Sequence, residues 1–523
     1  MKNLFAGIDS STQSTKLLVI DFDSKAVVYT DSLNYDKDLP KYNTKNGVLQ
    51  NMGEGVSESN PEMWIDALDI LFDRLKSSNI PQQNIKEISV SGQQHGLVVL
   101  DSKGNLSRKT AKLWNDYSTQ KECDLLTEAL GGIENIIEEV GNSQLPGYTA
   151  AKIFHFVRNE PKAYAKTSTL FLVHNYINWH LSGGKNGGIR VMEPGDTSGM
   201  ALWNPKTGKW SKKAVNAIAP DLRKKLPEVQ ASDKSIGYIG KNMAEKYGLN
   251  PNCKIDAGSG DNMYGAIGTG NTKPGIVTIS LGTSGTAYTF LQKAFIDPLG
   301  EIAAFCDSTG HHLPLVCVSN LANGYNDILE RYQLTHQEFN EIIKQTEAGN
   351  KGRILIPWYE GERTPSVPQA TPTYFGFGLG DFTKEILARA VLEGHILNLY
   401  DGFKKLPVKV DEIRLTGGLS KSEAWRQCIA DIFEAETVAV SGEGAAIGAA
   451  IHAAWVWNKE NGNDIPLNKI TDDFVKLDES SRTKPIDRNK EIYQKQKQLF
   501  SVLSENLRIS AKGDIFKLRS EIR

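Results

Sequence analysis

The chain has 523 residues, more than a single hydrophobic core usually serves, so two large lobes or three smaller domains are expected. Hydrophobic residues make up 40% and charged residues 23% of the chain, which is typical of a folded protein and excludes an intrinsically disordered one. The 60 basic and 62 acidic residues nearly cancel, and the densest basic run is only Arg223-Lys224-Lys225, so a nucleic-acid-binding protein is not indicated.

Neither a membrane span nor a secretion signal is predicted. No segment approaches the roughly 18 consecutive apolar residues of a membrane helix, and the apolar segment 445–457 contains His452 and indicates a buried Ala-rich helix. The five cysteines lie far apart, without the spacing of a zinc site or a disulfide framework. The histidines also lack metal-binding spacing. These features predict a cytoplasmic protein with reduced thiols.

A hairpin followed by a helix is predicted at the start of the chain. The strands cover residues 4–9 and 15–21, joined by the polar turn 10–14. The helix begins with Asn60 as its N-cap and Pro61 at its first position. Its apolar residues recur at helical spacing: Met63, Trp64, Ala67, Leu68, Leu71, Phe72 and Leu75.

Polar segments follow further predicted strands in the first half of the chain. A strand over 85–91 ends in the turn 92–96, which leads into another strand at 97–100. A strand that begins at Cys253 runs into the small polar loop 258–262, and a helix follows. Polar residues at the carboxyl ends of strands are where α/β proteins place their ligand contacts.

The second half opens in the same way as the first. Strands are predicted at 275–281 and 286–290 around the turn 282–285. A strand at 412–416, the turn 417–420 and helices at 423–433 and 489–507 come later. This repetition predicts an α/β protein with two duplicated lobes, residues 1–270 and 271–523. Two unrelated hairpins would produce the same faint match, and this alternative stays open.

The two turns, 10–14 and 282–285, are candidates for binding a polyphosphate. Small residues allow the backbone to approach closely, and Ser and Thr hydroxyls add donors. Neither a G-x-x-x-x-G-K-[ST] loop nor a G-x-G-x-x-G loop is present. Asp9 and Asp261 each end a predicted strand, where a carboxylate could hold Mg²⁺ or accept a proton. The alternatives are ordinary hairpin turns and aspartates that bond their own loops.

Taken together and in order, these segments resemble the FGGY carbohydrate kinases, from about residue 5 to residue 507. The matching segments are 7–16, 91–96, 113–116, 146–152, 196–199, 258–262, 280–285, 361–365, 416–427 and 444–450. Each could arise by chance, whereas the ordered set identifies the chain as similar to this family. The resemblance implies the actin/hexokinase/Hsp70-like ATPase fold, with two ribonuclease H-like lobes flanking a catalytic cleft.

The resemblance also implies the reaction and the site. Asp261 would be the base that takes a proton from the sugar's terminal hydroxyl, and Asp9 would hold Mg²⁺, largely through water. The sugar would lie in the N-terminal lobe against Gln94, His95, Asp261 and Asn262. ATP would lie mainly on the C-terminal lobe, and its contacts would be Ser11, Thr12, Lys16, Gly282, Thr283, Ser284, Gly417, Gly418, Ser420 and Gln427. A homodimer is common in the family.

Segments 92–96 and 146–152 favour D-xylulose, phosphorylated at its 5-position, over ribulose, gluconate or glycerol. Gln94 stands where bacterial members with this specificity usually carry Met, so the exact sugar stays open. A chaperone-type ATPase is the rival from another class, but the residues beyond Pro485 are too few for its substrate-binding domain. A non-catalytic sugar or ATP sensor is a further alternative, against which the intact Asp9 and Asp261 argue. Residues 509–523 suggest no role.

Overall fold

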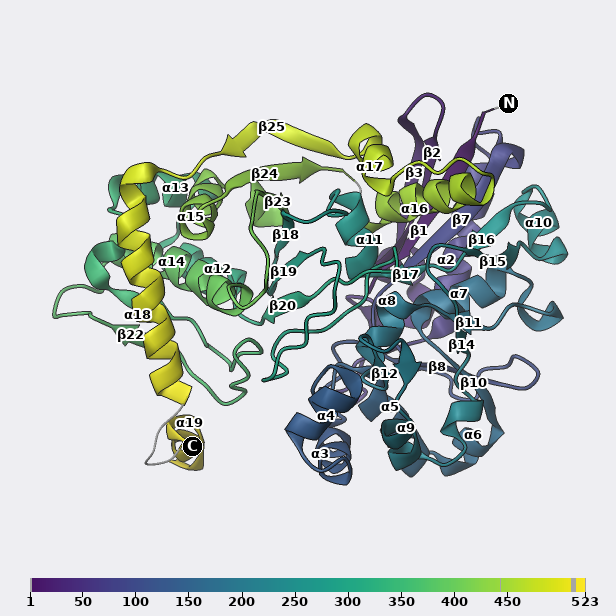
Figure 1. Cartoon of the computed structure of the whole chain (residues 1–523), viewed down its shortest axis with the longest axis horizontal. Coiled ribbons are helices and arrows are strands. Elements are labelled where there is room, and N and C mark those ends of the chain that lie inside the picture. The colour runs from purple at the N-terminus through teal and green to yellow at the C-terminus, as the bar shows by residue number, and fades with distance from the viewer. Residues whose placement is uncertain (1, 443, 509–513, 523) are drawn as a thin grey trace. The chain divides into compact units, whose positions relative to one another are not determined.

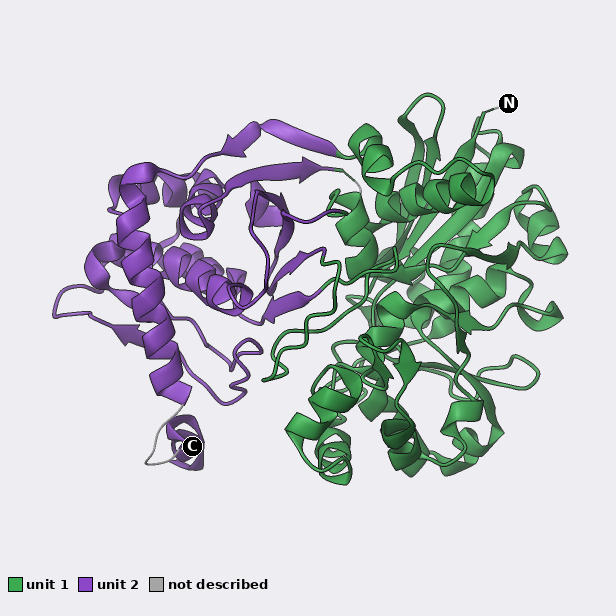
Figure 2. Cartoon of the chain, in the orientation of Figure 1, with its two compact units in different colours: residues 1–272, 291–313, 442–475 green, residues 273–290, 314–441, 476–523 purple. Residues whose placement is uncertain are grey.

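The computed structural model describes residues 2–442, 444–508 and 514–522 (Figure 1). The chain forms two compact units (Figure 2). Unit 1 consists of residues 1–272, 291–313 and 442–475, and unit 2 of residues 273–290, 314–441 and 476–523. Unit 1 therefore takes two segments from the second half of the chain. Of the tail 509–523, the described part contains α19 (Ile515–Ile522), and the rest lies outside the described residues.

Unit 1 is built on a sheet in the order β15-β16-β7-β1-β2-β3, with β17 also beside β7. The three strands β1, β2 and β3 pair antiparallel, β1–β7 and β7–β16 pair parallel, and β16–β15 pairs antiparallel. Its strands are β1 (Leu4–Ser10), β2 (Ser14–Asp21), β3 (Ala26–Asn34), β7 (Ile85–Gly92), β15 (Ser235–Tyr238), β16 (Lys254–Asp256) and β17 (Ser259–Gly260).

The sheet of unit 2 repeats this arrangement in the order β20-β19-β18-β23-β24-β25. Two antiparallel pairs, two parallel pairs and one antiparallel pair follow one another as in unit 1. The shared pattern confirms the prediction of two duplicated α/β lobes. The strands are β18 (Ile276–Leu281), β19 (Gly285–Thr289), β20 (Leu315–Val318), β23 (Glu412–Thr416), β24 (Glu436–Ser441) and β25 (Lys476–Thr483).

Both units also contain helices, and the helices predicted from apolar spacing and caps are confirmed. In unit 1 they include α2 (Pro61–Lys76), α3 (Gln120–Ala129), α4 (Ile133–Val140), α5 (Thr149–Asn159), α7 (Val173–Leu181), α8 (Pro194–Thr197), α11 (Asp261–Gly268), α16 (Gly444–Glu460) and α17 (Leu467–Phe474). In unit 2 they include α12 (Ala322–Tyr332), α13 (His336–Gln345), α14 (Lys384–Phe403), α15 (Glu423–Phe433) and α18 (Lys490–Arg508). Among the described residues, no helix has both the length and the apolar character of a membrane span.

Strand β1 separates two cores because its side chains alternate between the faces of the sheet. Leu4, Ala6 and Ile8 belong to the core that includes α2, whereas Phe5 belongs to the core formed with α11 and α16. The alternation places Gly7 and Asp9 on the same face as Phe5. Asp9 therefore lies on the side of the sheet that α11 and α16 cover.

Three glycines let α16 and α11 pack directly against the backbone. A Cβ on Gly7 would lie 2.0 Å from the Ala446 carbonyl oxygen, and one on Gly448 would lie 1.9 Å from the Tyr264 carbonyl oxygen. A Cβ on Gly268 would lie 2.1 Å from the Gly444 carbonyl oxygen. Small residues at these positions therefore let β1, α11 and α16 pack closely. This packing fixes the positions of Asp9 on β1 and Asp261, the first residue of α11.

We expect Gly7→Ala to lower the free energy of unfolding by about 3 kcal/mol, because the added methyl group has no space against α16. Thermal and urea unfolding would measure the loss. Gly378→Ala is the matched control, since a Cβ there meets only the Asp381 carboxylate at 3.5 Å. An equal effect of both substitutions would contradict the close packing of β1 against α16.

Candidate active site

Asp9 and Ser91 meet where two parallel strands end. Asp9 pairs with Ser91 in the register of β1 and β7, and the Ser91 hydroxyl donates a 2.7 Å hydrogen bond to Asp9 Oδ1. On the other side of β1, Asp9 is opposite Lys16 of β2. Burial raises the pKa of Asp9, opposed by the Ser91 hydrogen bond and the charge of Lys16.

Asp261 is the first residue of α11, directly after β17. Since β17 pairs with the end of β7 at Ser91 and Gly92, Asp261 lies at the same edge of the sheet as Asp9. The Asn262 amide N–H donates to Asp261 Oδ1 at 2.9 Å, and Asn262 Nδ2 donates to Gln94 Oε1 at 2.7 Å. Predicted site residues from β1, the turn after β7 and α11 are thus brought together.

The electrostatics of this group favour a proton on Asp261. Burial raises the pKa of Asp261 to about 8, with further contributions from the negative charges of Asp9 and Asp196. The Asp261 side chain nevertheless stays partly accessible to solvent. A partly accessible carboxyl whose pKa lies near neutrality is suited to proton transfer with a bound substrate.

The first turn is held by its own hydroxyls. The Ser11 backbone N–H and hydroxyl both donate to the Ser14 carbonyl at 3.0 Å. The Thr12 hydroxyl donates to Gln93 Oε1 at 3.2 Å and accepts from Trp114 Nε1 at 2.9 Å. This turn therefore lies beside the segment that follows β7, in the same part of unit 1 as Asp9.

His95 is buried directly after Gln94, with its backbone in the left-handed region at φ 64°. Its ring lies against Tyr148 and Phe305, with centroid separations of 5.1 and 5.6 Å. Phe305 belongs to the segment 291–313, which joins unit 1 from the second half of the chain. The structure thus places Gln94, His95, Asp261 and Asn262, all predicted to contact the sugar, in one neighbourhood.

Asp196 of α8 is the central residue for which the sequence predicted no role. Its Oδ1 accepts from Gln94 Nε2 at 3.4 Å and from the His95 backbone N–H at 3.3 Å. Its Oδ2 lies 3.6 Å from His174 Nδ1. The only signal in the sequence was that Asp196 belongs to a segment shared with the FGGY pattern. No local feature indicates that this carboxylate approaches residue 95.

In unit 2, two turns predicted to contact ATP lie side by side. Gly417 has φ 85°, and a Cβ on it would lie 2.4 Å from the Leu281 carbonyl oxygen, directly before the turn 282–284. The Thr283 carbonyl accepts from the backbone N–H groups of Leu321 and Ala322, where α12 begins. Gly282, Thr283, Gly417 and Gly418 are exposed, whereas Ser420 is buried and bonds the Gly417 carbonyl at 2.8 Å.

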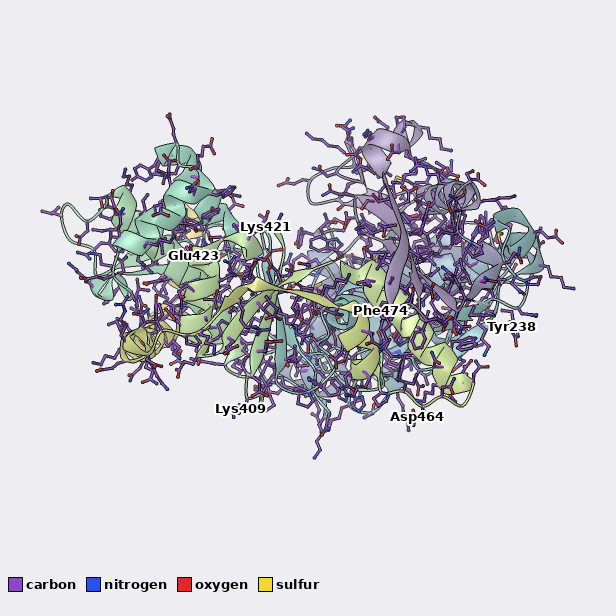
Figure 3. All side chains as sticks on the ribbon, turned by 90° about the horizontal axis from the view of Figure 1, so that it is seen from above. Tyr238, Lys409, Lys421, Glu423, Asp464 and Phe474 are labelled. Atoms are coloured by element: carbon purple, nitrogen blue, oxygen red, sulfur yellow. The ribbon has the colours of Figure 1, made fainter. Side chains whose placement is uncertain are left out.

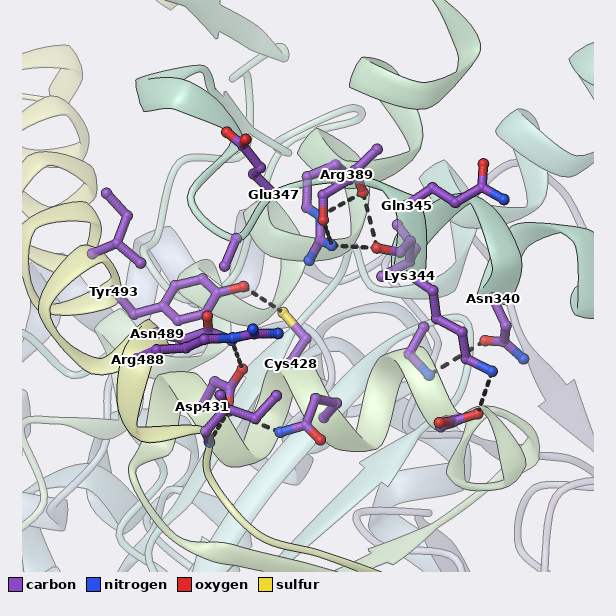
Figure 4. Close-up of a pocket in the computed structure, with 18 residues that line it drawn as sticks. Asn340, Lys344, Gln345, Glu347, Arg389, Cys428, Asp431, Arg488, Asn489 and Tyr493 are labelled. Carbon is purple, nitrogen blue, oxygen red and sulfur yellow. Dashed lines mark hydrogen bonds and ion pairs between the residues drawn. The ribbon is translucent and has the colours of Figure 1, made fainter.

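Gln427 lies on α15, the helix that follows the turn 417–420, and the neighbouring Arg426 donates to the Ser420 carbonyl at 3.1 Å. The helix begins at Glu423, after Lys421 ends the preceding turn, and both side chains are exposed (Figure 3). Gln427 lines a cavity of about 650 Å³ with residues of α13, α14, α15 and α18 (Figure 4). Its amide donates to Asp431 Oδ1 at 2.9 Å and to the Lys484 carbonyl at 3.0 Å. Neither turn lines this cavity, so the nucleotide role of Gln427 stays a prediction.

A second cavity, of about 960 Å³, lies in unit 1 and is lined by none of the predicted site residues. Its wall includes Tyr176 and Trp179, whose rings are stacked at a centroid separation of 5.6 Å. Within the ranges that the structure describes, no group of three or more His, Cys, Asp or Glu residues could hold a metal ion.

Comparison with known families covers most of the chain. The N-terminal domain of the FGGY family of carbohydrate kinases matches residues 4–268, and the C-terminal domain of this family matches residues 277–457. These two matches include the hairpin turns of both units and both carboxylates. They agree with the fold resemblance expected from the sequence.

Individual proteins are similar over nearly the whole chain. A xylulose kinase from Haemophilus influenzae is 36% identical over 92% of this chain and 95% of its own length. A xylulose kinase from Lactococcus lactis is 31% identical over 95% of this chain and 97% of its own length. The crystal structure of xylulose kinase from Bifidobacterium adolescentis has a TM-score of 0.80 and 27% identity, covering 94% of this chain and 99% of that one.

Proposed function

This chain belongs to the FGGY family of carbohydrate kinases, and we propose that it transfers the γ-phosphoryl group of ATP to D-xylulose. As a member of this family it is an enzyme that phosphorylates a sugar hydroxyl, with ATP as the phosphoryl donor. The names of the similar proteins support xylulose over ribulose, gluconate or glycerol. The D-configuration and phosphorylation at the 5-position rest on the family resemblance. The observation that carries the catalytic proposal is the environment of Asp261.

Asp261 is the proposed general base. Its carboxylate accepts the proton of the terminal hydroxyl as that oxygen attacks the γ-phosphorus in line. The new O–P bond forms, the bond from the γ-phosphorus to the β,γ-bridging oxygen breaks, and ADP leaves. The hydrogen bond from the Asn262 backbone N–H fixes the carboxylate, and the raised pKa of Asp261 makes its ionised form a stronger base.

Gln94, His95 and Asn262 are proposed to bind the sugar hydroxyls. Gln94 and Asn262 are already hydrogen-bonded to each other, so their amide groups have fixed orientations. Fixed donors and acceptors discriminate strongly between hydroxyl patterns, because a wrong sugar leaves buried polar groups unpaired. This arrangement supports a hydroxyl-rich substrate beside Asp261.

The phosphates are proposed to lie against the two hairpin turns. Ser11, Thr12 and Lys16 would serve in unit 1, and in unit 2 the contacts would be Gly282, Thr283, Ser284, Gly417, Gly418, Ser420 and Gln427. Asp9 and Asp261 supply the oxygen ligands that Mg²⁺ prefers. The charge of Asp9 also raises the pKa of Asp261, and a bound cation would offset this repulsion between the two carboxylates. Asp9 would hold the ion, largely through water. When bound, Mg²⁺ would neutralise charge on the phosphate oxygens.

We also propose that the protein works in the cytosol as a homodimer. All five cysteines are free in the structure, which supports a reducing compartment. The homodimer rests on the family resemblance alone. Size-exclusion chromatography with light scattering would measure the assembly, and a monomer at working concentration would contradict it.

A coupled ADP-release assay with Mg·ATP tests the proposed substrate. The panel should contain D-xylulose, L-xylulose, D- and L-ribulose, D-fructose, glycerol and gluconate. We expect the highest kcat/KM for D-xylulose. A higher value for another member would replace the substrate while retaining the family. No activity on any member, with Mg·ATP still bound, would favour a sugar or ATP sensor.

A further inference from the structure

The backbone of His95 adopts a conformation that needs support from its surroundings. Its φ of 64° lies in the left-handed region, which few residues other than glycine occupy. Such a conformation persists when neighbouring groups hold it, and it is common where a side chain is presented to a ligand. Groups around His95 must therefore hold this conformation.

Buried polar groups hold the His95 backbone from both ends. The N–H donates to Asp196 Oδ1 at 3.3 Å. The carbonyl accepts from the Thr149 hydroxyl at 3.2 Å and from Lys152 Nζ at 3.0 Å. The residues Thr149, Lys152 and Asp196 are fully buried. Both polar atoms of this backbone unit are thus fixed by side chains from α5 and α8.

Lys152 is unusual because its amine donates to backbone carbonyls deep in the protein. Besides the His95 carbonyl, Nζ donates to the Gly147 carbonyl at 2.5 Å. Burial lowers the pKa of Lys152 to about 7, and the amine donates hydrogen bonds in both protonation states. A lysine is costly to bury, so this one is poorly explained by core packing alone.

The imidazole of His95 is positioned by the same elements. Its Nδ1 lies 3.5 Å from Asp196 Oδ1, and its ring packs against the Tyr148 and Phe305 rings, whose own centroids are 6.3 Å apart. A Cβ on Gly199, three residues after Asp196, would lie only 2.3 Å from His95 Cε1. The segment 196–199 therefore lies close to the His95 ring at Gly199 and accepts a hydrogen bond from the His95 backbone at Asp196.

We propose that Lys152 and Asp196 are positioning residues that clamp the His95 backbone and so aim its imidazole at the sugar. This inference rests on the proposed function, which places His95 in the sugar site. Lys152 acts on the substrate only through His95, whereas Asp196 also accepts a hydrogen bond from Gln94 and raises the pKa of Asp261. Their loss should weaken sugar binding and leave ATP binding unchanged.

A double-mutant cycle tests whether Lys152 acts through His95. Lys152→Met removes the donor at similar volume, and His95→Asn removes the imidazole while tolerating the left-handed backbone. We expect Lys152→Met to raise the KM for D-xylulose about tenfold, with kcat and the KM for ATP within about threefold. In the His95→Asn background, the same change should alter the sugar KM less than about twofold. Equal factors in both backgrounds, or no change in the sugar KM, would overturn the proposal.

Matched variants separate positioning from folding. Lys225→Met is the control, because Lys225 Nζ also donates to a backbone carbonyl, that of Thr167 at 2.7 Å, away from the site. Its sugar KM should stay at the wild-type value. If Lys152→Met does not fold by circular dichroism, the same cycle with Thr149→Val decides, because the Thr149 hydroxyl donates to the same His95 carbonyl at 3.2 Å, and the same factors are expected.

A failure of the proposed function can be distinguished from a failure of the His95 clamp. If wild-type enzyme phosphorylates another panel sugar in preference to D-xylulose, that substrate claim is wrong, and the cycle is measured with the preferred sugar. If wild-type enzyme phosphorylates none of them, sugar dissociation constants from calorimetry replace KM in the cycle. In each case additivity contradicts the clamp, and non-additivity supports it.

Discussion

Asp261→Asn should lower kcat about 10²–10⁴-fold, the usual contribution of a general base. The KM values for sugar and ATP should stay within a few fold, because asparagine keeps the size of the side chain and an oxygen that can accept the Asn262 N–H. The residual rate would come from the positioning of the substrates and from electrostatic support of the transferred phosphoryl group. Steady-state kinetics by coupled ADP release would measure kcat, and calorimetry would measure sugar affinity.

Asp473→Asn is the matched control for this prediction. Asp473 also loses a negative charge in unit 1, but its partner is the exposed Lys25, at 2.8 Å. Exposed ion pairs of this kind contribute little, so the control should have wild-type kinetics. If Asp261→Asn retained kcat within about fivefold of wild type, Asp261 would lose its role as the base.

The second large effect is on the pH dependence of kcat/KM for the sugar. The base works only when ionised, and burial with the charges of Asp9 and Asp196 raises the pKa of Asp261 to about 8. The active form of the free enzyme is therefore lost as the pH falls below about 8. We expect kcat/KM to fall about 50-fold between pH 8, where the base is half ionised, and pH 6, and by about tenfold for each further pH unit.

The variant Asp196→Asn tests whether the fall in kcat/KM below about pH 8 comes from protonation of Asp261. Removing the Asp196 charge removes one cause of the raised pKa of Asp261, so the fall should shift to lower pH. The residual activity of Asp261→Asn should lack the fall altogether. If wild-type kcat/KM for the sugar did not change between about pH 6 and pH 8, the raised pKa of Asp261 would not control the reaction rate.

Local patterns explain what could be predicted from the sequence. The two hairpins, the capped helix α2 and the polar carboxyl ends of β1 and β7 depend on residues close together in the chain. Polar residues at the carboxyl ends of strands indicated ligand contacts there, whereas the pairing of β1 with β7 that brings Asp9 beside Ser91 is seen in the structure. The FGGY resemblance then supplied the roles.

Contacts between distant segments account for what could not be predicted. The hydrogen bond from His95 to Asp196 joins residues 101 positions apart, and neither residue type demands the other. Phe305, beside the His95 ring, comes from beyond the first strands of unit 2. The Ala-rich segment 445–457 indicated a buried helix, but nothing local identified Gly7 as its neighbour.

The interleaving of the two units has a consequence for how the chain acquires its structure during synthesis. Phe5 of β1 packs in a core with residues of α16 and α17, which are translated more than four hundred positions later. Until that stretch has left the ribosome, the face of the first sheet that carries Asp9 has no helix α16 to cover it. Contacts so distant in sequence form slowly, because the entropy cost of closing a long loop comes before the contacts lower the free energy. The nascent N-terminal half therefore exposes an apolar sheet face for most of translation, which makes it a natural client for chaperones.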